Sequence, residues 1–411
     1  MPKKELIHAL AKLAVKVGVN VQKGQMVVVR STTDTAEIAR AVAHEAYLAG
    51  ASDVSVIWQD PYVSHDALVF RSKEDLANIP ESFVQMYREF IDAGACLVAI
   101  VSPVPGLNSD TDPEKSQALM MATNEKLGFY REYTMGSRGQ WTIIGAPNVH
   151  WAEKVFPHLK GDEAVEALYQ AILETSRVRD GQDAIANWDA HNKAMLAHNK
   201  VLNDYNFQSL HFKNSLGTDL VVGLVPNHRW AGGGEHTTKG IYYNPNIPTE
   251  ENFTMPSTTN VHGKVFATKP LDYQGRLIDG FWLEFKDGKV VDFDAKAEKE
   301  TLGKLLDTDE GSRKIGEIAL ISHDSPISNT NLLFFNTLFD ENASCHMALG
   351  RAYPMNVAGG LDMSPEELKI AGANHSLVHV DFMFGSADME ITGRTQSGKE
   401  VAVFKKGNFV I

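Results

Sequence analysis

The chain has 411 residues, of which 43% are hydrophobic and 22% charged, and its formal net charge at pH 7 is −13. This length favours two domains, and the composition is ordinary for a globular protein. An acidic chain is repelled by a phosphate backbone and by an anionic lipid surface, so we expect neither nucleic acid nor a membrane as a partner.

The N-terminal segment predicts an amphipathic helix rather than a leader or a membrane anchor. Leu6, Leu10 and Leu13 fall on one helical stripe, and no apolar run reaches the ~18 residues of a membrane span. The two cysteines, Cys96 and Cys345, form no disulfide framework. These features together predict a cytoplasmic protein.

Strand and helix signals alternate over residues 1–190. Short apolar runs rich in β-branched residues predict strands, and the segments between them have helical periodicity. The predicted strands are 25–31, 51–58, 95–102 and 140–147, and the predicted helices are 35–50, 80–94 and 114–127. This alternation predicts a mainly parallel sheet covered by helices. No glycine-rich nucleotide-binding motif follows any of these strands, so no nucleotide cofactor is expected.

The second half of the chain is rich in strands. Two long helical segments, 161–180 and 184–204, lead into it, and hairpins are predicted around residues 214–219 and around Asp287-Gly288. One further helix is predicted over 296–306. We therefore predict an α/β domain over residues 1–190 and a strand-rich α+β domain over residues 205–411, which contains the candidate metal ligands.

One predicted strand of the second half carries an imidazole and a carboxylate two residues apart. In the segment 374–393, His379 and Asp381 alternate with large apolar residues, so a strand places both on one face. Such a pair can be aimed at one metal ion. A half-exposed edge strand with its polar residues in water explains the pattern equally well.

Two further segments place carboxylates in unusual surroundings. Glu317 opens the apolar run "RKIGEIALIS", where a buried carboxylate needs partners, although a strand-end residue that faces water is the alternative. Glu250 and Glu251 lie between Pro248 and Pro256, which make their segment stiff and extended. An acidic surface loop is the alternative there.

The stretch "LFDENASCHMALGRAYP" contains a further histidine, glutamate and tyrosine. A continuous helix over 342–353 would place His346 and Tyr353 on one face, because they are seven residues apart. A break at Gly350 would separate them. Glu341 then lies in the loop that enters the helix, where a role at a metal and a favourable charge at the helix N-terminus are both open.

The collected carboxylates and imidazoles suit a borderline divalent ion such as zinc, cobalt or manganese. The candidate ligands are Glu251, Glu317, His346, His379 and Asp381. Five ligands exceed what one open catalytic ion needs, whereas two ions that share a bridging carboxylate use the whole set. The residues alone leave open a non-haem iron site and a non-catalytic cation-binding protein.

Several motifs resemble those of the thermophilic aminopeptidase T and aminopeptidase S family of metallo-aminopeptidases. They are "IPTEENFTMP", "GEIAL", "DENASCHMALGRAYP" and "HVDFMFGSADMEITG", and the likeness extends to "WAGGGEH" and over nearly the whole chain. The resemblance implies an enzyme that removes N-terminal residues from short peptides with a free N-terminus. It also implies two divalent metal ions per chain and a homodimer.

The resemblance also implies roles for single residues. One of Glu251 and Glu317 bridges the two ions, and the remaining metal ligands are His346, His379 and Asp381. The adjacent glutamates 250 and 251 leave open which of them is the ligand.

The water that attacks the peptide bond needs a general base. Glu250 is our first choice and Glu341 the second. Tyr353 lies beside the metals, where it donates a hydrogen bond to the developing oxyanion or binds a metal as tyrosinate. In "WAGGGEH" we expect Trp230 and His236 to contact the substrate.

Overall fold

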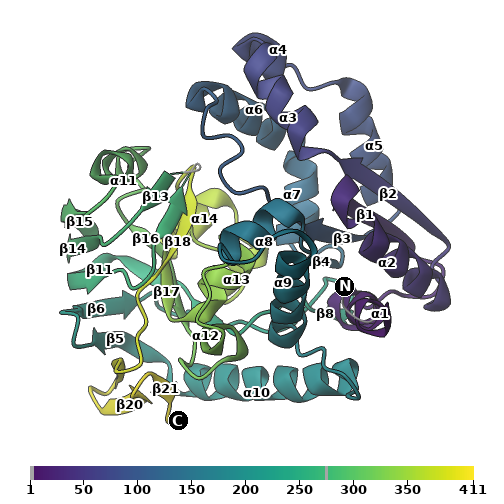
Figure 1. The fold of residues 1–411 in the computed structure, drawn as a ribbon. Coiled ribbons are helices and arrows are strands. Elements are labelled where there is room, and N and C mark those ends of the chain that lie inside the picture. Colours follow the sequence, from purple (N-terminus) through teal and green to yellow (C-terminus); the bar gives the residue numbers. More distant parts are fainter. Residues whose placement is uncertain (1–3, 274–275) are drawn as a thin grey trace. The chain divides into compact units, whose positions relative to one another are not determined.

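The computed structural model describes residues 4–273 and 276–411, which are drawn in Figure 1. The chain divides into two compact units. The first contains the residues up to Ala190 together with Gly234–Pro248, and the second contains His191–Gly233 and Thr249–Ile411. Within the described residues, no helix combines the length and the apolar character that a membrane crossing requires.

The first unit is built on a five-stranded parallel sheet with the order β2-β1-β3-β4-β9. Strands and helices alternate along the chain, so the predicted parallel α/β architecture is confirmed. The strands of this unit are β1 Met26–Thr32, β2 Asp53–Gln59, β3 Cys96–Val101, β4 Trp141–Gly145, β7 Glu235–His236, β8 Tyr242–Tyr243 and β9 Asn246–Ile247.

Helices cover this sheet. They are α1 Lys4–Leu13, α2 Ala36–Leu48, α3 Pro61–Phe70, α4 Lys73–Ala77, α5 Glu81–Asp92, α6 Pro113–Lys126, α7 Gly128–Met135, α8 Val149–Val155 and α9 Gly161–Thr175. Residues of α5 and α7 pack in one apolar cluster with Val28, Leu97 and Trp141, which lie side by side on β1, β3 and β4. The long helix α10 (Ala184–Tyr205) carries the chain from the first unit into the second.

The second unit contains two antiparallel sheets that share one apolar core. The larger sheet has the order β15-β14-β11-β6-β5-β19-β20-β21, and the smaller has the order β10-β16-β17-β18. The strands of the larger sheet are β5 Phe207–Lys213, β6 Asp219–Leu224, β11 Pro256–Phe266, β14 Trp282–Lys286, β15 Lys289–Asp294, β19 Glu390–Thr395, β20 Glu400–Lys405 and β21 Asn408–Phe409. Those of the smaller sheet are β10 Asn252–Thr254, β16 Ile315–Leu320, β17 His346–Gly350 and β18 His379–Met383.

Both predicted hairpins of this unit are present. The strands β5 and β6 pair in antiparallel fashion, as do β14 and β15. Asp287 and Gly288 connect the second pair with φ values of 49° and 80°, the left-handed conformation that tight hairpin turns require. The remaining elements are the β12–β13 pair (Leu271–Tyr273 and Arg276–Ile278), α11 Lys299–Leu306, α12 Pro326–Asn329, α13 Thr337–Asp340 and α14 Pro365–Ile370.

The continuous helix that we considered over residues 342–353 does not form. The short helix α13 ends at Asp340, a 3-10 turn follows over Glu341–Ala343, and His346–Gly350 is the strand β17. All five residues of β17 are buried, and β16 and β18 flank this strand in the small sheet. A short run of small and apolar residues has no periodicity that separates a buried strand from a buried helix.

Candidate metal centre

The small sheet of the second unit brings four of the five predicted ligands onto one face. Glu317 in β16 and Asp381 in β18 are both paired with Ala348 in β17, one from each side. His346 lies two residues from Ala348, and His379 lies two residues from Asp381. Because alternate side chains of a strand project to the same side, these ligands share one face.

The opposite face of the same strands anchors them in the apolar core. Ile318, Met347, Leu349 and Phe382 are all buried in the core cluster of the second unit, and Val380 packs against it. The alternation that we predicted for residues 378–384 is therefore present. It orients His379 and Asp381 away from the core, toward the candidate centre.

A β-bulge orients Glu317. The pairing of β16 with β17 shifts register between Ile315 and Glu317, and Gly316 lies at that irregularity. A Cβ atom on Gly316 would lie 2.3 Å from the carbonyl oxygen of Arg351, so no larger residue fits there without a backbone movement. Bulges commonly redirect a side chain next to a functional site, and the glycine of "GEIAL" has this structural reason.

Glu251 reaches the centre from the residue before β10, and a glycine supports its backbone. A Cβ atom on Gly232, whose φ is +135°, would lie 1.9 Å from the carbonyl oxygen of Glu251. Ala231 and Phe253 also exchange backbone hydrogen bonds of 3.0 and 2.9 Å. Gly232 of "WAGGGEH" therefore allows the close approach of the backbone at Glu251.

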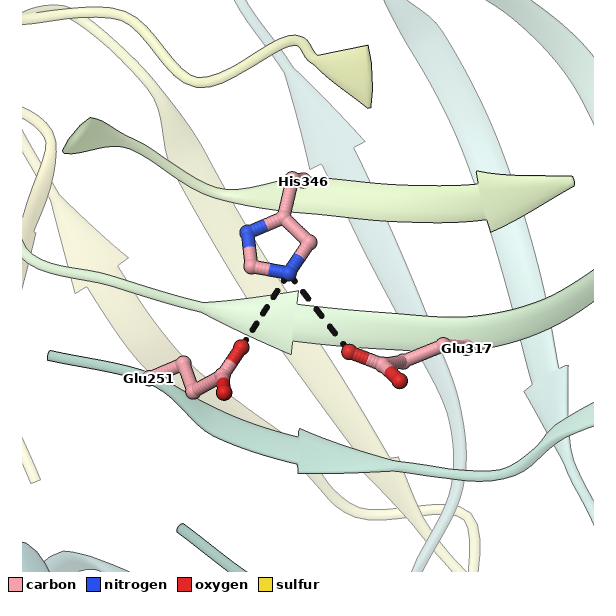
Figure 2. A group of neighbouring side chains, drawn as sticks. All are labelled: Glu251, Glu317 and His346. Atoms are coloured by element: carbon pink, nitrogen blue, oxygen red, sulfur yellow. Dashed lines mark ion pairs between the residues drawn. The ribbon is translucent and has the colours of Figure 1, made fainter. Parts of the chain in front are cut away.

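Two of the predicted carboxylate ligands, Glu251 and Glu317, converge on a ring nitrogen of a third predicted ligand, His346, as Figure 2 shows. His346 Nε2 lies 3.2 Å from Glu251 Oε2 and 3.5 Å from Glu317 Oε1. The second oxygen of Glu317 faces another histidine, because Oε2 lies 3.7 Å from His379 Nε2. His379 Nε2 also lies 3.6 Å from Asp381 Oδ1. Glu317 thus stands between two groups of potential ligands.

The histidines are oriented by backbone carbonyl groups. His379 Nδ1 lies 2.7 Å from the carbonyl oxygen of Arg351, which can only accept a hydrogen bond, so Nδ1 carries the proton. His346 Nδ1 lies 3.4 Å from the carbonyl oxygen of Ser344. Both rings therefore turn Nε2 toward the carboxylates. This arrangement leaves a neutral histidine with Nε2 as the atom that can bind a metal.

The side chains of the centre are buried, and they shift one another's pKa values. Glu317 and His346 are 4% and 1% exposed, so the alternative in which Glu317 faces water is excluded. Burial raises the pKa of Glu317, against the effect of its contact with His346. Burial alone would lower the pKa of His346, but the carboxylates of Glu251 and Glu317 outweigh it and raise this pKa well above its ordinary value.

The balance of charge fits bound cations. Four carboxylates, those of Glu251, Glu317, Glu341 and Asp381, surround two imidazoles, and among the described residues no lysine or arginine pairs with them. Asp381 Oδ1 is buried and has no hydrogen-bond partner in the described part of the chain. An unpartnered buried carboxylate oxygen is costly, and a divalent ion would satisfy it.

Glu341 and Tyr353 border the same group of residues. Glu341 and Asp381 line a cavity of about 240 Å³. Burial, followed by the carboxylates of Asp381 and Glu251, raises the pKa of Glu341 well above its ordinary value. The ring of Tyr353 lies 4.6 Å from that of His379, and burial and the neighbouring carboxylates raise its pKa well above its ordinary value.

The other predicted site residues lie in different surroundings. The backbone N–H of Glu250 donates a hydrogen bond of 2.8 Å to Asn342 Oδ1, which fixes the loop before Glu251. Trp230 is buried in the core cluster of the second unit, and its contact with substrate stays a prediction. His236 belongs to the first unit, where its ring contacts Tyr242.

The sequence interpretation missed Ala348 as a part of the site. This small side chain stands between Glu317 and Asp381 in the register of the sheet and leaves room between the two carboxylates. The sequence carries one signal for this role. His346, Ala348 and Gly350 alternate with the large apolar residues Met347 and Leu349, so a strand places the three on the face opposite to those apolar side chains. That signal is visible only once the segment is known to be a strand.

Comparisons with known proteins identify the family of this chain. Residues 3–409 match the family described as thermophilic metalloprotease (M29). The chain is 44% identical to Aminopeptidase 2 of Geobacillus stearothermophilus over 399 residues, which cover 97% of this chain and 96% of that protein. It is 38% identical to the solved structure of wild-type AmpT from Thermus thermophilus, with a TM-score of 0.93 and coverage of 99% and 100%.

A more distant likeness concerns the fold alone. The structure of 2,5-dihydroxypyridine dioxygenase from Pseudomonas putida KT2440 matches with a TM-score of 0.53 at 13% identity, over 100% of this chain and 98% of that one. Function therefore has to be argued from the site rather than from the fold. The match along the whole chain and the buried cluster of carboxylates and histidines lead to one conclusion: the chain belongs to the thermophilic metalloprotease family (M29).

Proposed function

We propose that this protein is an aminopeptidase that holds two divalent metal ions and removes N-terminal residues from short peptides. The observation that carries the proposal is the position of Glu317. Its oxygens Oε1 and Oε2 face His346 and His379 respectively, at 3.5 and 3.7 Å. A carboxylate between two ligand groups suits a bridge between two ions.

The chain supplies one set of ligands for each ion. Glu251, His346 and Oε1 of Glu317 would hold one ion, and His379, Asp381 and Oε2 of Glu317 would hold the other. Divalent ions bound in this way polarise a peptide carbonyl group and lower the pKa of a water molecule. Nitrogen and oxygen ligands of this kind suit zinc, cobalt or manganese.

Glu341 is the side chain that we propose as general base, ahead of our first choice, Glu250. A base must reach the water that it deprotonates, and Glu341 lines the cavity beside Asp381. The backbone contact of Glu250 with Asn342 instead supports a positioning role for the loop.

Tyr353 is proposed as a neutral hydrogen-bond donor. Burial and then the surrounding carboxylates raise its pKa well above the ordinary value. Its ring lies against that of His379, so its hydroxyl group belongs to the surroundings of the centre. A donor in this position would stabilise negative charge that develops on the carbonyl oxygen.

The cavity beside the centre supports the proposed substrate class. Its lining includes the carboxylates of Asp272, Asp340, Glu341 and Asp381, which favour the positive charge of a free N-terminus. Its volume of about 240 Å³ lies below the ~300–1,000 Å³ that is typical of pockets for drug-sized ligands, so it suits the end of a peptide. The predicted homodimer and cytoplasmic location are parts of the same proposal.

The test is hydrolysis of leucine and arginine p-nitroanilides by chelator-treated protein, with Zn²⁺, Co²⁺, Mn²⁺ or Mg²⁺ restored in turn. We expect metal-dependent release that Glu317→Ala and His346→Ala abolish and that N-acetylated substrates do not give. The exposed residues Glu366 and His375 provide matched controls, so Glu366→Ala and His375→Ala should retain activity. Tight metal binding without release would instead support a non-catalytic cation site, and release that requires Fe(II) and oxygen would support a non-haem iron enzyme.

A further inference from the structure

A second cavity lies in the first unit, over one face of the parallel sheet. Its volume is about 170 Å³. The strands β1 to β4 contribute Val28, Arg30, Ile57, Leu97, Ala99, Trp141 and Ile143 to its lining, and the helices α5 and α7 contribute Tyr87, Tyr130, Thr134 and Met135. The cavity is thus apolar and rich in aromatic rings, with one arginine.

Arg30 is the unusual member of this lining. It is half-buried, and within the described residues no carboxylate lies at ion-pair distance from its guanidinium group. The side chain projects to the same face of β1 as Val28, because the two are two residues apart. Burial raises the pKa of Tyr130 while the charge of Arg30 opposes that effect, so the guanidinium group lies near the Tyr130 hydroxyl.

Arg30 lies on a central strand of the sheet, next to the point where the strand order reverses. β1 has β2 on one side and β3 on the other, so the connections from β1 to β2 and from β2 to β3 run in opposite directions across the sheet. Arg30 lies in the carboxyl half of β1 and is paired with Ala99 of β3.

We propose that this cavity binds a small monocarboxylate with an apolar body. The guanidinium group of Arg30 would hold the carboxylate through paired hydrogen bonds, and Tyr87, Tyr130 and Trp141 would enclose the body. Among the residues that the structure describes, no acidic side chain lines the cavity, so the ammonium group of a free amino acid would lack a partner. A free organic acid and the carboxyl end of a peptide with an apolar last residue share the required chemistry.

The test is calorimetric titration of the metal-loaded protein with 3-phenylpropionate and with 3-phenylpropanamide, which has the same body without the charge. We expect the acid to bind at least about tenfold more tightly than the amide, since hydrogen bonds between charged groups are the strong ones. N-acetyl-alanyl-phenylalanine distinguishes the two sources: if it binds more tightly than 3-phenylpropionate the natural ligand is a peptide end, and if it binds more weakly the ligand is a free acid.

Variants locate the binding. Arg30→Gln should weaken binding of the acid at least about tenfold, whereas Arg394→Gln, at an exposed position of the second unit, should not. Ala99→Leu keeps the charge of Arg30 and fills the cavity, so it should weaken the binding of the acid and of the amide to the same extent. Melting curves confirm that the variant is folded. Equal affinity for acid and amide or no binding of either acid would overturn the proposal. Acid binding that survives Arg30→Gln and Ala99→Leu but is lost in Glu317→Ala and His346→Ala would also overturn it, because the acid would then bind at the metal centre.

Discussion

Asp340 is a buried carboxylate whose pKa results from opposing effects. Burial raises the pKa to about 6. The backbone N–H groups of Phe334 and Asn336 donate hydrogen bonds of 2.7 and 3.0 Å to its two oxygens, and these bonds together with the charge of Lys269 act in the other direction. The side chain thereby closes the loop that enters α13, beside the proposed base.

The raised pKa predicts that Asp340 lowers stability as the pH rises. An unfolded aspartate titrates near ~3.9. Between that value and about 6 the folded protein keeps a proton that the unfolded chain has lost, so this contribution is full below pH ~3.9 and is lost as the pH rises through about 6. Relative to Asp340→Asn, the free energy of unfolding of the unmodified protein should fall by about 1–2 kcal/mol between pH 5 and pH 8.

Urea unfolding at the two pH values measures this difference. Titrating groups that do not interact with Asp340 contribute equally in the two proteins, so their contributions cancel. Asp362→Asn, at an exposed position, is the control and should show no pH-dependent difference. A difference between the unmodified protein and Asp340→Asn that stays constant with pH would contradict the assignment.

The two candidate bases can be separated by amide substitution. Glu341→Gln removes the proton acceptor that we place in the cavity, so kcat should fall about 10²–10⁴-fold while the metal content stays unchanged. Glu250→Gln should lower kcat less than about tenfold, because its role is in the loop backbone. Metal content is measured by atomic emission on the same samples as the kinetics. The opposite ranking would return the role to Glu250.

At the scale of the element, β17 acts as a spacer between two ligand-bearing strands. Ala348 is paired with Glu317 on one side and with Asp381 on the other. Neighbouring side chains on one sheet face lie only ~4.5–5.5 Å apart, so a larger side chain at this position enters the space between the two carboxylates. Ala348→Leu should therefore weaken metal binding at least about tenfold although it removes no ligand.

Met347 provides the matched control, because it is the next residue of β17 and faces the core. Met347→Leu conserves volume and should cost less than ~1.5 kcal/mol of stability, with metal affinity unchanged. Metal titration by calorimetry compares the two variants. Equal metal affinity of Ala348→Leu and the unmodified protein would show that the space between Glu317 and Asp381 is not occupied by an ion.

The sequence predicts elements better than it predicts their pairing. Alternation at 378–384 indicates β18, and its two polar residues lie on one face as expected. The strand β17 is missed because "HMALG" lacks a polar alternation, since both of its faces are buried. Long-range pairing sets the register that aligns Glu317, Ala348 and Asp381, and it also sets the bulge at Gly316. No local sequence pattern encodes this pairing.

At the scale of the whole molecule, local periodicity is enough to predict the fold class of each half. It does not predict that residues 234–248 return to the first unit, where Asn246–Ile247 pairs with β4. A strand of two residues is too short to show a hydrophobic periodicity, and contacts with a distant segment determine its place. The candidate ligands, from Glu251 to Asp381, all belong to the second unit, and this has a thermodynamic consequence.

A ligand that binds only the folded state stabilises the part of the protein that forms its site. At a free ion concentration of about 100 Kd the gain is about 2.7 kcal/mol, which corresponds to a rise of about 5–10 °C in the melting temperature of a unit of this size. Because no predicted ligand lies in the first unit, we expect two calorimetric transitions, of which chelation lowers only that of the second unit.

Differential scanning calorimetry with and without EDTA measures this effect, and Glu317→Ala provides the control. That variant lacks the shared carboxylate, so its second-unit transition should be nearly insensitive to added metal. If chelation lowered both transitions equally in the unmodified protein, the two units would unfold as one cooperative body. If it lowered neither, the carboxylates and histidines of the small sheet would hold no ion, and the metal dependence expected from the family would have to arise elsewhere in the chain.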